Sequence, residues 1–398
     1  MNNYKLIYKM DPKVIGIGHN GGELNFELID TELSIVNSLR RVMITNIKSL
    51  VFRGFPHKEN LIKISKNNSK FNNEYLKHRI QCIPIHYDDE SNFDAMIKQY
   101  DVRLKVSNDT NNIRYVTTHD FVIYNKGTGQ PVTSTSNINV RTMFPPDILS
   151  NHYIHICCLM PKISEGDEIE ELILIIDFSV GISKEDSCWN MVSKCCFENK
   201  RDTQAIEKYL KKDKDAVAKF YKNDPVAIDT YMKTTMTPEE ETDFRILDAQ
   251  RIYAENSYIM KVESVGVFTN EAIVKKACDY ILFRMNEFIH FLKDAVIEKV
   301  VNKEKFCLYV DTTTIKPTFC LYIQNDDYTI GKIIEKYLYL MFKTQIFYVS
   351  FKKEHPHDTH CLISFAYNDE VTSEVIIDNL RIVAGELIRV YEIISSKF

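Results

Sequence analysis

A short alternation of apolar residues, followed directly by a helical stripe, constrains the fold of this chain more than any other feature. Leu24, Phe26 and Leu28 alternate with polar residues, which predicts a half-buried strand. Apolar residues then recur at helical spacing, and they are Leu33, Val36, Leu39, Met43 and Ile47. Asp30 or Thr31 is placed to cap this helix. The pattern predicts a strand that leads at once into an amphipathic helix.

The centre of this predicted helix carries the most specific motif of the chain, the segment Asn37-Ser38-Leu39-Arg40-Arg41. In its strand-and-helix context, the motif resembles the assembly domain of the alpha-like subunits of multisubunit RNA polymerases. These are the bacterial alpha, the archaeal D and the eukaryotic third subunits. Three further segments are similar to the same family and follow in its order. They are HRIQCIPI within residues 75–85, GISKEDSCW at residues 181–189, and VESVG within residues 260–266.

The last quarter of the chain resembles a different member of the same assembly. Residues 325–331 read NDDYTIG and residues 352–356 read KKEHP. These segments are similar to the smaller partner of the alpha-like subunit, the archaeal L or eukaryotic eleventh subunit. Lys332 and Glu335 depart from that pattern, in which Asn and Arg are usual, so polar contacts of this helix are in doubt. The chain resembles both halves of the polymerase assembly dimer fused into one polypeptide.

Each predicted half ends in a helical stripe whose apolar residues lie about 3.5 residues apart, a spacing that keeps one face turned to one partner. The first stripe is Val274, Ala277, Ile281, Met285, Phe288, Leu292 and Ala295, and the second is Ile376, Leu380, Val383, Leu387, Val390 and Ile394. We expect the two helices to pack on each other. The residues predicted to pair the modules are Ile281, Met285, Phe288, Leu292, Ile376, Leu380, Val383 and Leu387. Pairing within one chain predicts a monomer and no homodimer, since no entropy of association opposes it.

The predicted fold class is α+β, with two related sheet-plus-helix dimerisation modules paired within one chain. The predicted domains are a first module at residues 1–50 and 166–303, with a helical elaboration at 198–256; a β-rich insert domain at 51–165; and a second module at 304–398. The apolar run 172–178 is assigned to the sheet of the first module. A second strand-and-helix unit is predicted at 306–323 and 328–342. Within the elaboration we expect two to four short helices, one of them starting at Thr237.

Composition excludes several classes of function. The chain has 50 basic and 55 acidic residues, a formal net charge of −5, so no excess of positive charge marks direct binding of nucleic acid. Lysines and acidic residues are interleaved in residues 198–256, which favours a solvated face. No apolar run approaches the roughly 20 residues of a membrane span. The ten cysteines show no pattern of a small disulfide-rich domain, which favours a reducing intracellular setting.

The cysteines could in principle bind a metal ion. Many relatives in the resembled family hold a metal through a cysteine cluster in the insert domain, but residues 82–103 offer only Cys82 and His86. A zinc site built from Cys188, Cys195 and Cys196 stays open, although no four-ligand spacing is visible. Buried thiols are the alternative that we favour.

Two other segments could carry chemistry. Residues 355–360, with His355, His357 and His360, could form a metal-dependent or acid–base cluster, but the resemblance explains His355 and Pro356 as the start of a strand. Residues 16–22 read GIGHNGG and lack the strand–loop–helix context of a phosphate-binding loop. We therefore expect no catalytic residue, no metal and no cofactor.

The resemblance implies a non-catalytic assembly scaffold of a DNA-directed RNA polymerase. It implies that Asn37, Ser38, Arg40 and Arg41 face the two largest subunits, whereas the alternative is that the arginines only cover an exposed helix face. Small zinc-binding subunits, similar to the eukaryotic tenth and twelfth, are the other expected partners. The one-chain fusion is known from large cytoplasmic DNA viruses, which suggests a viral source, with location in the host cytoplasm and the virion. The competing interpretations are a scaffold that reuses the fold outside transcription and an enzyme using residues 355–360.

Overall fold

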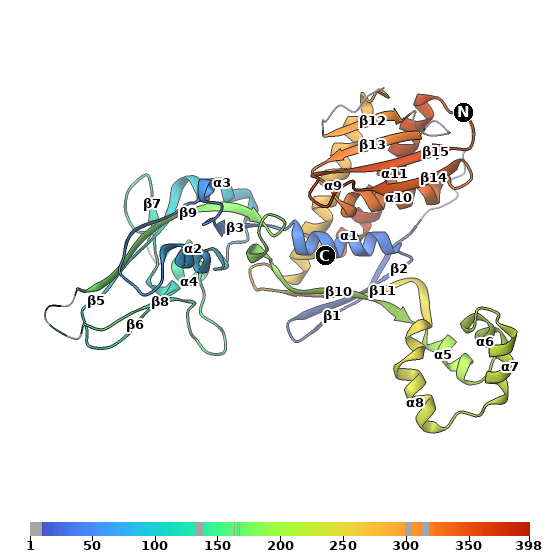
Figure 1. Ribbon diagram of the computed structural model, residues 1–398, viewed down its shortest axis with the longest axis horizontal. Helices are drawn as coiled ribbons and strands as arrows, with labels where there is room; N and C mark the ends of the chain where they lie inside the picture. Colours follow the sequence, from blue (N-terminus) through green and yellow to red (C-terminus); the bar gives the residue numbers. More distant parts are fainter. Residues whose placement is uncertain are drawn as a thin grey trace. The chain divides into compact units, whose positions relative to one another are not determined.

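The computed structural model describes residues 10–132, 138–162, 164, 166, 168–298, 305–311 and 318–398 (Figure 1). Its residues form antiparallel sheets and helices, so the fold is α+β as predicted. The chain divides into two compact units. The first contains the described residues of 1–41, 194–263 and 274–398, and the second contains those of 42–193 and 264–273. The predicted boundary between modules, at residues 303 and 304, lies outside the described residues.

The first unit contains a four-stranded sheet built around the predicted first strand. In spatial order its strands are β1 (Lys13–Asn20), β2 (Glu23–Ile29), β11 (Tyr253–Ser264) and β10 (Val192–Arg201). Leu24, Phe26 and Leu28 are all buried, which confirms the predicted alternation. Phe26 lies opposite Met260, whose side chain is buried on the same face. This alternation fixes the register, because a slip by one residue would turn the apolar set toward solvent.

Helix α1 (Leu33–Thr45) follows β2 as predicted, but it is not capped as predicted. The backbone of Asp30 has a φ of 53°, and the hydroxyl of Thr31 donates to the carbonyl of Ile29. The first turn of the helix is closed by the carbonyl of Glu32, which accepts from the N–H of Val36 at 3.4 Å. The expectation of a cap by Asp30 or Thr31 was wrong, because the helix begins at Leu33 and the residue directly before it is Glu32.

The second sheet of the first unit has the order β12 (Phe306–Asp311), β13 (Thr318–Gln324), β15 (His360–Tyr367), β14 (Ile346–Lys352). The strand predicted at 306–323 is thus a pair of antiparallel strands, and residues 312–317 between them lie outside the described residues. Helix α10 (Tyr328–Phe342) follows β13 and packs on β14 and β15. The long helices α9 (Asn270–Lys293) and α11 (Ser373–Ser395) cover the predicted stripes, except that Ala295 lies beyond the end of α9.

The helical elaboration is a small folded module of its own. Its helices are α5 (Thr203–Leu210), α6 (Lys214–Phe220), α7 (Pro225–Lys233), α8 (Pro238–Ile246) and the short 3-10 helix η5 (Asp248–Arg251). The predicted start of α8 is confirmed, because Thr237 and Glu240 form a reciprocal capping box. Tyr209 is at the centre of the module's core, stacked between Tyr231 and Phe244 with ring centroids 4.6 Å away on each side.

The second unit combines sheets and helices around one apolar core. The strands of its larger sheet are, in spatial order, β3 (Lys48–Phe52), β9 (Glu170–Ile182), β5 (Tyr100–Asn108) and β7 (Val122–Asn125). Strand β4 (Ile62–Asn67) also pairs with β9. A separate two-stranded sheet contains β6 (Arg114–Thr117) and β8 (His155–Leu159). Its helices are α2 (Asn73–Gln81), α3 (Phe93–Gln99) and α4 (Val140–Met143), with 3-10 turns η1 (His57–Glu59), η2 (Glu90–Asn92), η3 (Thr118–Asp120) and η4 (Ser187–Trp189). Strand β9 corrects one assignment: residues 172–178 form a strand, but it pairs with β3, β4 and β5 in this unit.

Two helix glycines provide a test of the packing in the first unit. A Cβ added at Gly331 in α10 would lie 2.1 Å from the ring of Phe351, whereas one added at Gly385 in α11 meets no atom within 4 Å. We expect Gly331→Ala to lower the free energy of unfolding by about 1–3 kcal/mol through overpacking. Gly385→Ala should raise it by roughly 0.5–1 kcal/mol, because alanine loses less backbone entropy in a helix. Chemical denaturation of both variants measures this, and equal effects would contradict the packing of α10 on β14.

Candidate subunit interface

Helix α1 is fixed to α11 by a pair of buried hydroxyl groups. The Ser38 hydroxyl oxygen lies 2.5 Å from that of Tyr391 and donates to the carbonyl of Ile35 at 2.7 Å. Ser38 is 2% exposed and Tyr391 is completely buried, so burial raises the pKa of the Tyr391 phenol well above its ordinary value. A buried polar pair of this kind favours one orientation of the two helices. Any other orientation would break the hydrogen bond between two groups that water cannot reach. Ser38 therefore faces the interior of this chain.

Arg41 is engaged with the start of α10. Its Nε donates to the hydroxyl of Thr329 at 2.9 Å, and its Nη2 donates to Asp327 Oδ2 at 3.0 Å. The other carboxylate oxygen of Asp327 accepts from the backbone N–H of Thr329, so Asp327 is also the cap of α10. A carboxylate at a helix N-terminus also interacts favourably with the helix dipole. One side chain thus caps α10 and binds α1.

The residue before this cap makes a second, more buried ion pair. Asp326 Oδ2 accepts from both Nε and Nη2 of Arg284 in α9, at 3.1 Å for Nε. The side chains are only 3% and 8% exposed. Burial alone would lower the pKa of Arg284, but the Asp326 carboxylate outweighs it and the net pKa is raised. Two consecutive aspartates therefore hold arginines from two different helices, α9 and α1, at the start of α10.

Arg40 has a different environment from Arg41. Its Nε and Nη2 both donate to Asn37 Oδ1, at 3.1 and 3.0 Å, which ties together two side chains of one helix turn. The carbonyl of Arg40 is 3.8 Å from the Cys195 sulfur of β10. Asn37 and Arg40 are both half-buried. Their side-chain hydrogen bonds to each other stay within α1.

The residues predicted to form the seams of α9 and α11 are all completely buried. They are Ile281, Met285, Phe288, Leu292, Ile376, Leu380, Val383 and Leu387. Arg381 of α11 donates from Nη2 to the carbonyl of Leu292 in α9 at 2.6 Å. The Tyr391 phenol of α11 also interacts electrostatically with the Cys278 thiol of α9. Direct packing of the one seam on the other stays a prediction.

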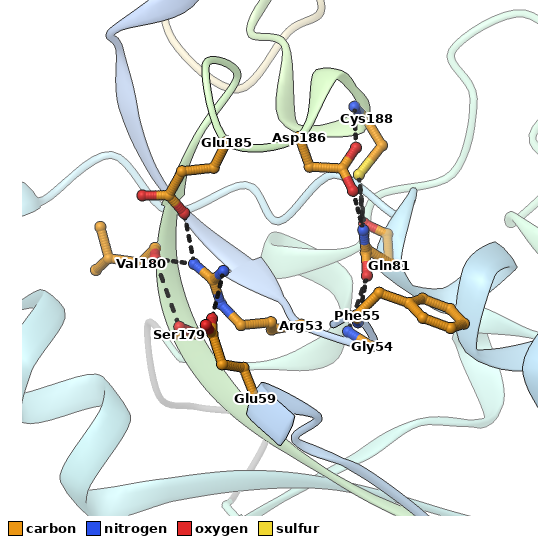
Figure 2. A network of polar contacts seen from close by, with 10 residues as sticks. All are labelled: Arg53, Gly54, Phe55, Glu59, Gln81, Ser179, Val180, Glu185, Asp186 and Cys188. Carbon is orange, nitrogen blue, oxygen red and sulfur yellow. Dashed lines mark hydrogen bonds and ion pairs between the residues drawn. The ribbon is translucent and has the colours of Figure 1, made fainter. Parts of the chain in front are cut away.

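In the second unit, Gln81 joins two of the segments that carry the resemblance (Figure 2). Its Oε1 accepts from the backbone N–H groups of Gly54 and Phe55 at 2.9 and 3.0 Å. Its Nε2 donates to Asp186 Oδ2 at 2.6 Å and lies 3.3 Å from the Cys188 sulfur. Gln81 is 2% exposed, so both ends of its amide are satisfied without bulk water. The sequence places Gln81 and Asp186 in separate motifs and gave no sign of their contact.

Arg53 lies beside this amide network and holds the same loop from its other end (Figure 2). Its guanidinium pairs with Glu59 at 3.2 Å and Glu185 at 2.8 Å, and it donates to the carbonyl of Val180 at 3.1 Å. The same guanidinium lies 4.6 Å from the ring centroid of Trp189. These contacts make the loop after β9 rigid and position the tryptophan of the GISKEDSCW segment.

The residues considered for metal or catalytic chemistry do not converge. In the described part of the chain, no group of three or more His, Cys, Asp or Glu side chains could hold a metal ion. His355 and Asp358 close a turn, in which Asp358 accepts from the backbone N–H of His355 at 2.8 Å. His360 instead stacks on Tyr322 in β13. Burial raises the pKa of the Cys188 and Cys195 thiols to about 12, so both favour the protonated form. No helix among the described residues is both long and apolar enough to cross a membrane.

Comparison with known proteins places this geometry in a family. Residues 25–282 match the model of the RNA polymerase Rpb3/Rpb11 dimerisation domain, which is more than half of the 398 residues. The chain belongs to this family. The match includes all four segments of the alpha-like resemblance. Helices α10 and α11 lie beyond the matched range.

Individual relatives match over shorter stretches. DNA-directed RNA polymerases II, IV and V subunit 3 and polymerases IV and V subunit 3B, both from Arabidopsis thaliana, are each 37% identical over 60 residues, 15% of this chain and 17% of the relative. A conjugation stage-specific protein of Tetrahymena thermophila is 27% identical over 182 residues, 42% of this chain and 53% of that protein. The chain thus spans about a sixth of the plant relatives and about half of the Tetrahymena protein.

The bond between Arg41 and Asp327 can be measured with a double-mutant cycle. The side chains are 29% and 22% exposed, so we expect a coupling energy of about 0.5–1 kcal/mol for Arg41→Ala with Asp327→Ala. Asp327→Ala alone should cost about 1 kcal/mol more than Arg41→Ala, because it also removes the cap of α10. The control cycle uses Lys233 and Asp229, an exposed pair one helical turn apart, which should show a coupling energy of only about 0.3–0.5 kcal/mol. A coupling no larger than in the control would contradict the network.

Gln81 allows a second test, because one variant keeps the shape of the side chain and changes only its charge. Gln81→Leu should cost roughly 2–3 kcal/mol by leaving the N–H groups of Gly54 and Phe55 unpaired in the interior. Gln81→Glu keeps that acceptor but brings a carboxylate against Asp186, which raises the folded-state pKa of the pair above its unfolded value. The Glu variant should therefore gain stability relative to wild type as pH falls through that raised pKa. Urea denaturation at several pH values tests this, and a pH-independent difference would contradict it.

Proposed function

We propose that this chain is a non-catalytic assembly subunit of a DNA-directed RNA polymerase that carries both dimerisation partners in one polypeptide. The first module corresponds to the third subunit or archaeal D, and the second to the eleventh subunit or archaeal L. The observation that carries the proposal is the pair of aspartates at the start of α10. Asp326 binds α9 and Asp327 binds α1, so the segment resembling the small partner is bonded to helices of the alpha-like part.

The pairing of the modules within one chain has a physical advantage for a scaffold. Two separate subunits would lose translational and rotational freedom on association, which costs on the order of 4–15 kcal/mol. A covalent link makes the contact intramolecular and supplies a high effective concentration. The buried seams of α9 and α11 and the buried pair of Ser38 and Tyr391 then hold the modules in one arrangement. A prearranged platform can bind the large subunits without first assembling itself.

We propose that the large catalytic subunits bind the α1 surface through Asn37 and Arg40. The guanidinium of Arg40 is oriented by Asn37, and such an ordered fork suits a carboxylate or a backbone carbonyl of a partner. Arg41 and Ser38 act in the same interface indirectly, because they position α1 on α10 and α11. Small zinc-binding subunits similar to the eukaryotic tenth and twelfth are the further partners of the proposal. The fused organisation supports a viral enzyme in the host cytoplasm and virion.

The second candidate function is a scaffold that uses the same fold outside transcription. The Tetrahymena relative supports this alternative, because its name refers to a stage of conjugation and it aligns over 182 residues. Stable association with large polymerase subunits distinguishes the two functions. The enzyme alternative at residues 355–360 has less support, because His355 and His360 are engaged in a turn and a ring stack.

Reconstitution with the two largest polymerase subunits of the same genome tests the proposal. Arg40→Ala should weaken their recovery with this chain by about tenfold or more, as expected when a central interface arginine is removed, and should leave thermal melting unchanged. Arg141→Ala, at an exposed position of α4, is the matched control and should assemble normally. Arg41→Ala should instead lower the melting temperature. Normal assembly of Arg40→Ala would reject the interface, and failure of the wild-type chain to bind either large subunit would reject the function.

A further inference from the structure

The helical module at residues 198–256 has a cavity at its base that none of the functions above uses. The cavity has a volume of about 450 Å³ and lies between α5, α6, η5 and the beginning of β11. Ala205, Ala216 and Ile252 form apolar parts of its wall. Lys219, Lys222 and Arg251 bring positive charge to it. A space of this size accommodates one large side chain of a partner with parts of its neighbours.

The charges of the module are segregated between its helices. Residues 208–222, which include the end of α5 and all of α6, contain six lysines against two aspartates, while Asp202 and Glu207 precede them in the α5 segment. Residues 224–248, which span α7 and α8, contain seven acidic residues against Lys233 and Arg245. The sequence interleaves the two signs closely enough to suggest a neutral, solvated face. Along the chain the module thus has a basic half, residues 208–222, which contributes Lys219 and Lys222 to the cavity, and an acidic half, residues 224–248.

The cations of the cavity are weakly engaged within the module. Lys219 lies 3.6 Å from Glu255, with both side chains about 80% exposed, and Arg251 lies 3.5 Å from Asp248. Exposed pairs of this kind contribute little, so a partner's carboxylates can replace them. Lys222 has no ion pair recorded in residues 198–256, all of which the structure describes. The N–H donors at the cavity thus remain available for an anionic ligand.

We propose that this cavity is a docking site for an acidic segment of a partner protein, in which a large apolar side chain enters the cavity and flanking Asp or Glu residues bind Lys219, Lys222 and Arg251. The apolar wall argues for a side-chain anchor. A nucleic acid fits less well because the acidic half of the module lies within the same small fold. A long polyanion would meet that repulsion, whereas a short segment need touch only the basic half.

The module is rigid enough to present such a site. Its core contains Tyr209, Tyr231 and Phe244 in stacked contact, and Val217 of α6 is completely buried in the same cluster. The N–H of Asp202 donates to the carbonyl of Ile252, so the two chain segments entering and leaving the module are joined at the cavity. A prearranged site reduces the entropy that binding would otherwise cost.

The test uses the full chain as bait for a displayed library of random peptides. The expected result is enrichment of peptides with a large apolar residue among Asp or Glu residues. Fluorescence anisotropy with the best labelled peptide should then show binding weakened about tenfold or more by Lys222→Glu with Arg251→Glu, as for charge reversal at a complementary interface. Ala205→Phe should weaken binding similarly by filling the cavity. The control, Lys58→Glu with Lys233→Glu, makes the same change in net charge at exposed positions elsewhere and should bind normally.

Thermal melting of each variant shows whether the fold is kept, and the surface charge reversals remove no core residue. The proposal is overturned if no peptide is enriched, if basic peptides are enriched, or if the charge-reversed chain binds as tightly as wild type. It is also overturned if a labelled single-stranded RNA binds this site more tightly than the acidic peptide does. Assembly with the large subunits is measured separately, so its failure would leave the result for this cavity unaffected.

Discussion

The start of α10 carries the interaction on which the first unit depends. Asp326 is almost fully buried and its charge is compensated by Arg284, while the next residue, Asp327, binds Arg41 and closes the first turn of its own helix. Removing one member of a buried ion pair leaves an uncompensated charge and typically costs 3–5 kcal/mol. A well-packed apolar pair could be equally stable, so the value of the aspartates lies in specificity. Their hydrogen bonds to Arg284 and Arg41 can form only when α1, α9 and α10 are oriented in one way relative to one another.

This arrangement explains why two adjacent arginines of one motif have different roles. Successive residues of a helix are about 100° apart around its axis, so Arg40 and Arg41 leave α1 in different directions. Arg41 is directed to Asp327 and helps to hold the chain together, whereas Arg40 bonds to Asn37 on its own helix. The same helix thus provides an internal joint and, in the proposed function, an external binding surface. The internal joint is what makes the external surface rigid.

Residues far from these helices use the same physical device, in which one side chain bonds to several partners from different segments. Gln81 accepts from two consecutive N–H groups and donates to Asp186, and Arg53 joins two carboxylates and a carbonyl. Gln81 is 2% exposed, so its bonds face little competition from water. The carboxylates that pair with Arg53 are about half exposed. The core of the helical module is organised differently, by stacked aromatic rings.

The sequence by itself determined the elements whose cause is local. The alternation from Leu24 to Leu28, the stripes of α9 and α11 and the capping box at Thr237 depend on residues within a few positions of one another, and the structure has all of them. The sequence also identified the motif in α1. The prediction was wrong about the cap of α1. It was also wrong about the sheet that contains residues 172–178, because an apolar strand pattern does not identify the strands with which it pairs.

Only the tertiary structure decided which polar groups meet. Arg41 and Asp327 are 286 positions apart, and Ser38 and Tyr391 are 353 positions apart. No periodicity spans such distances, and an arginine on a helix face looks the same in sequence whether it meets solvent, a partner or another part of its own chain. The same holds for the helical module, where folding brings Asp202, Lys219 and Arg251 from separate segments to the wall of one cavity. Local pattern specifies the elements because it depends on neighbouring residues, and the fold assigns their polar partners because those bonds form only when distant segments are packed together.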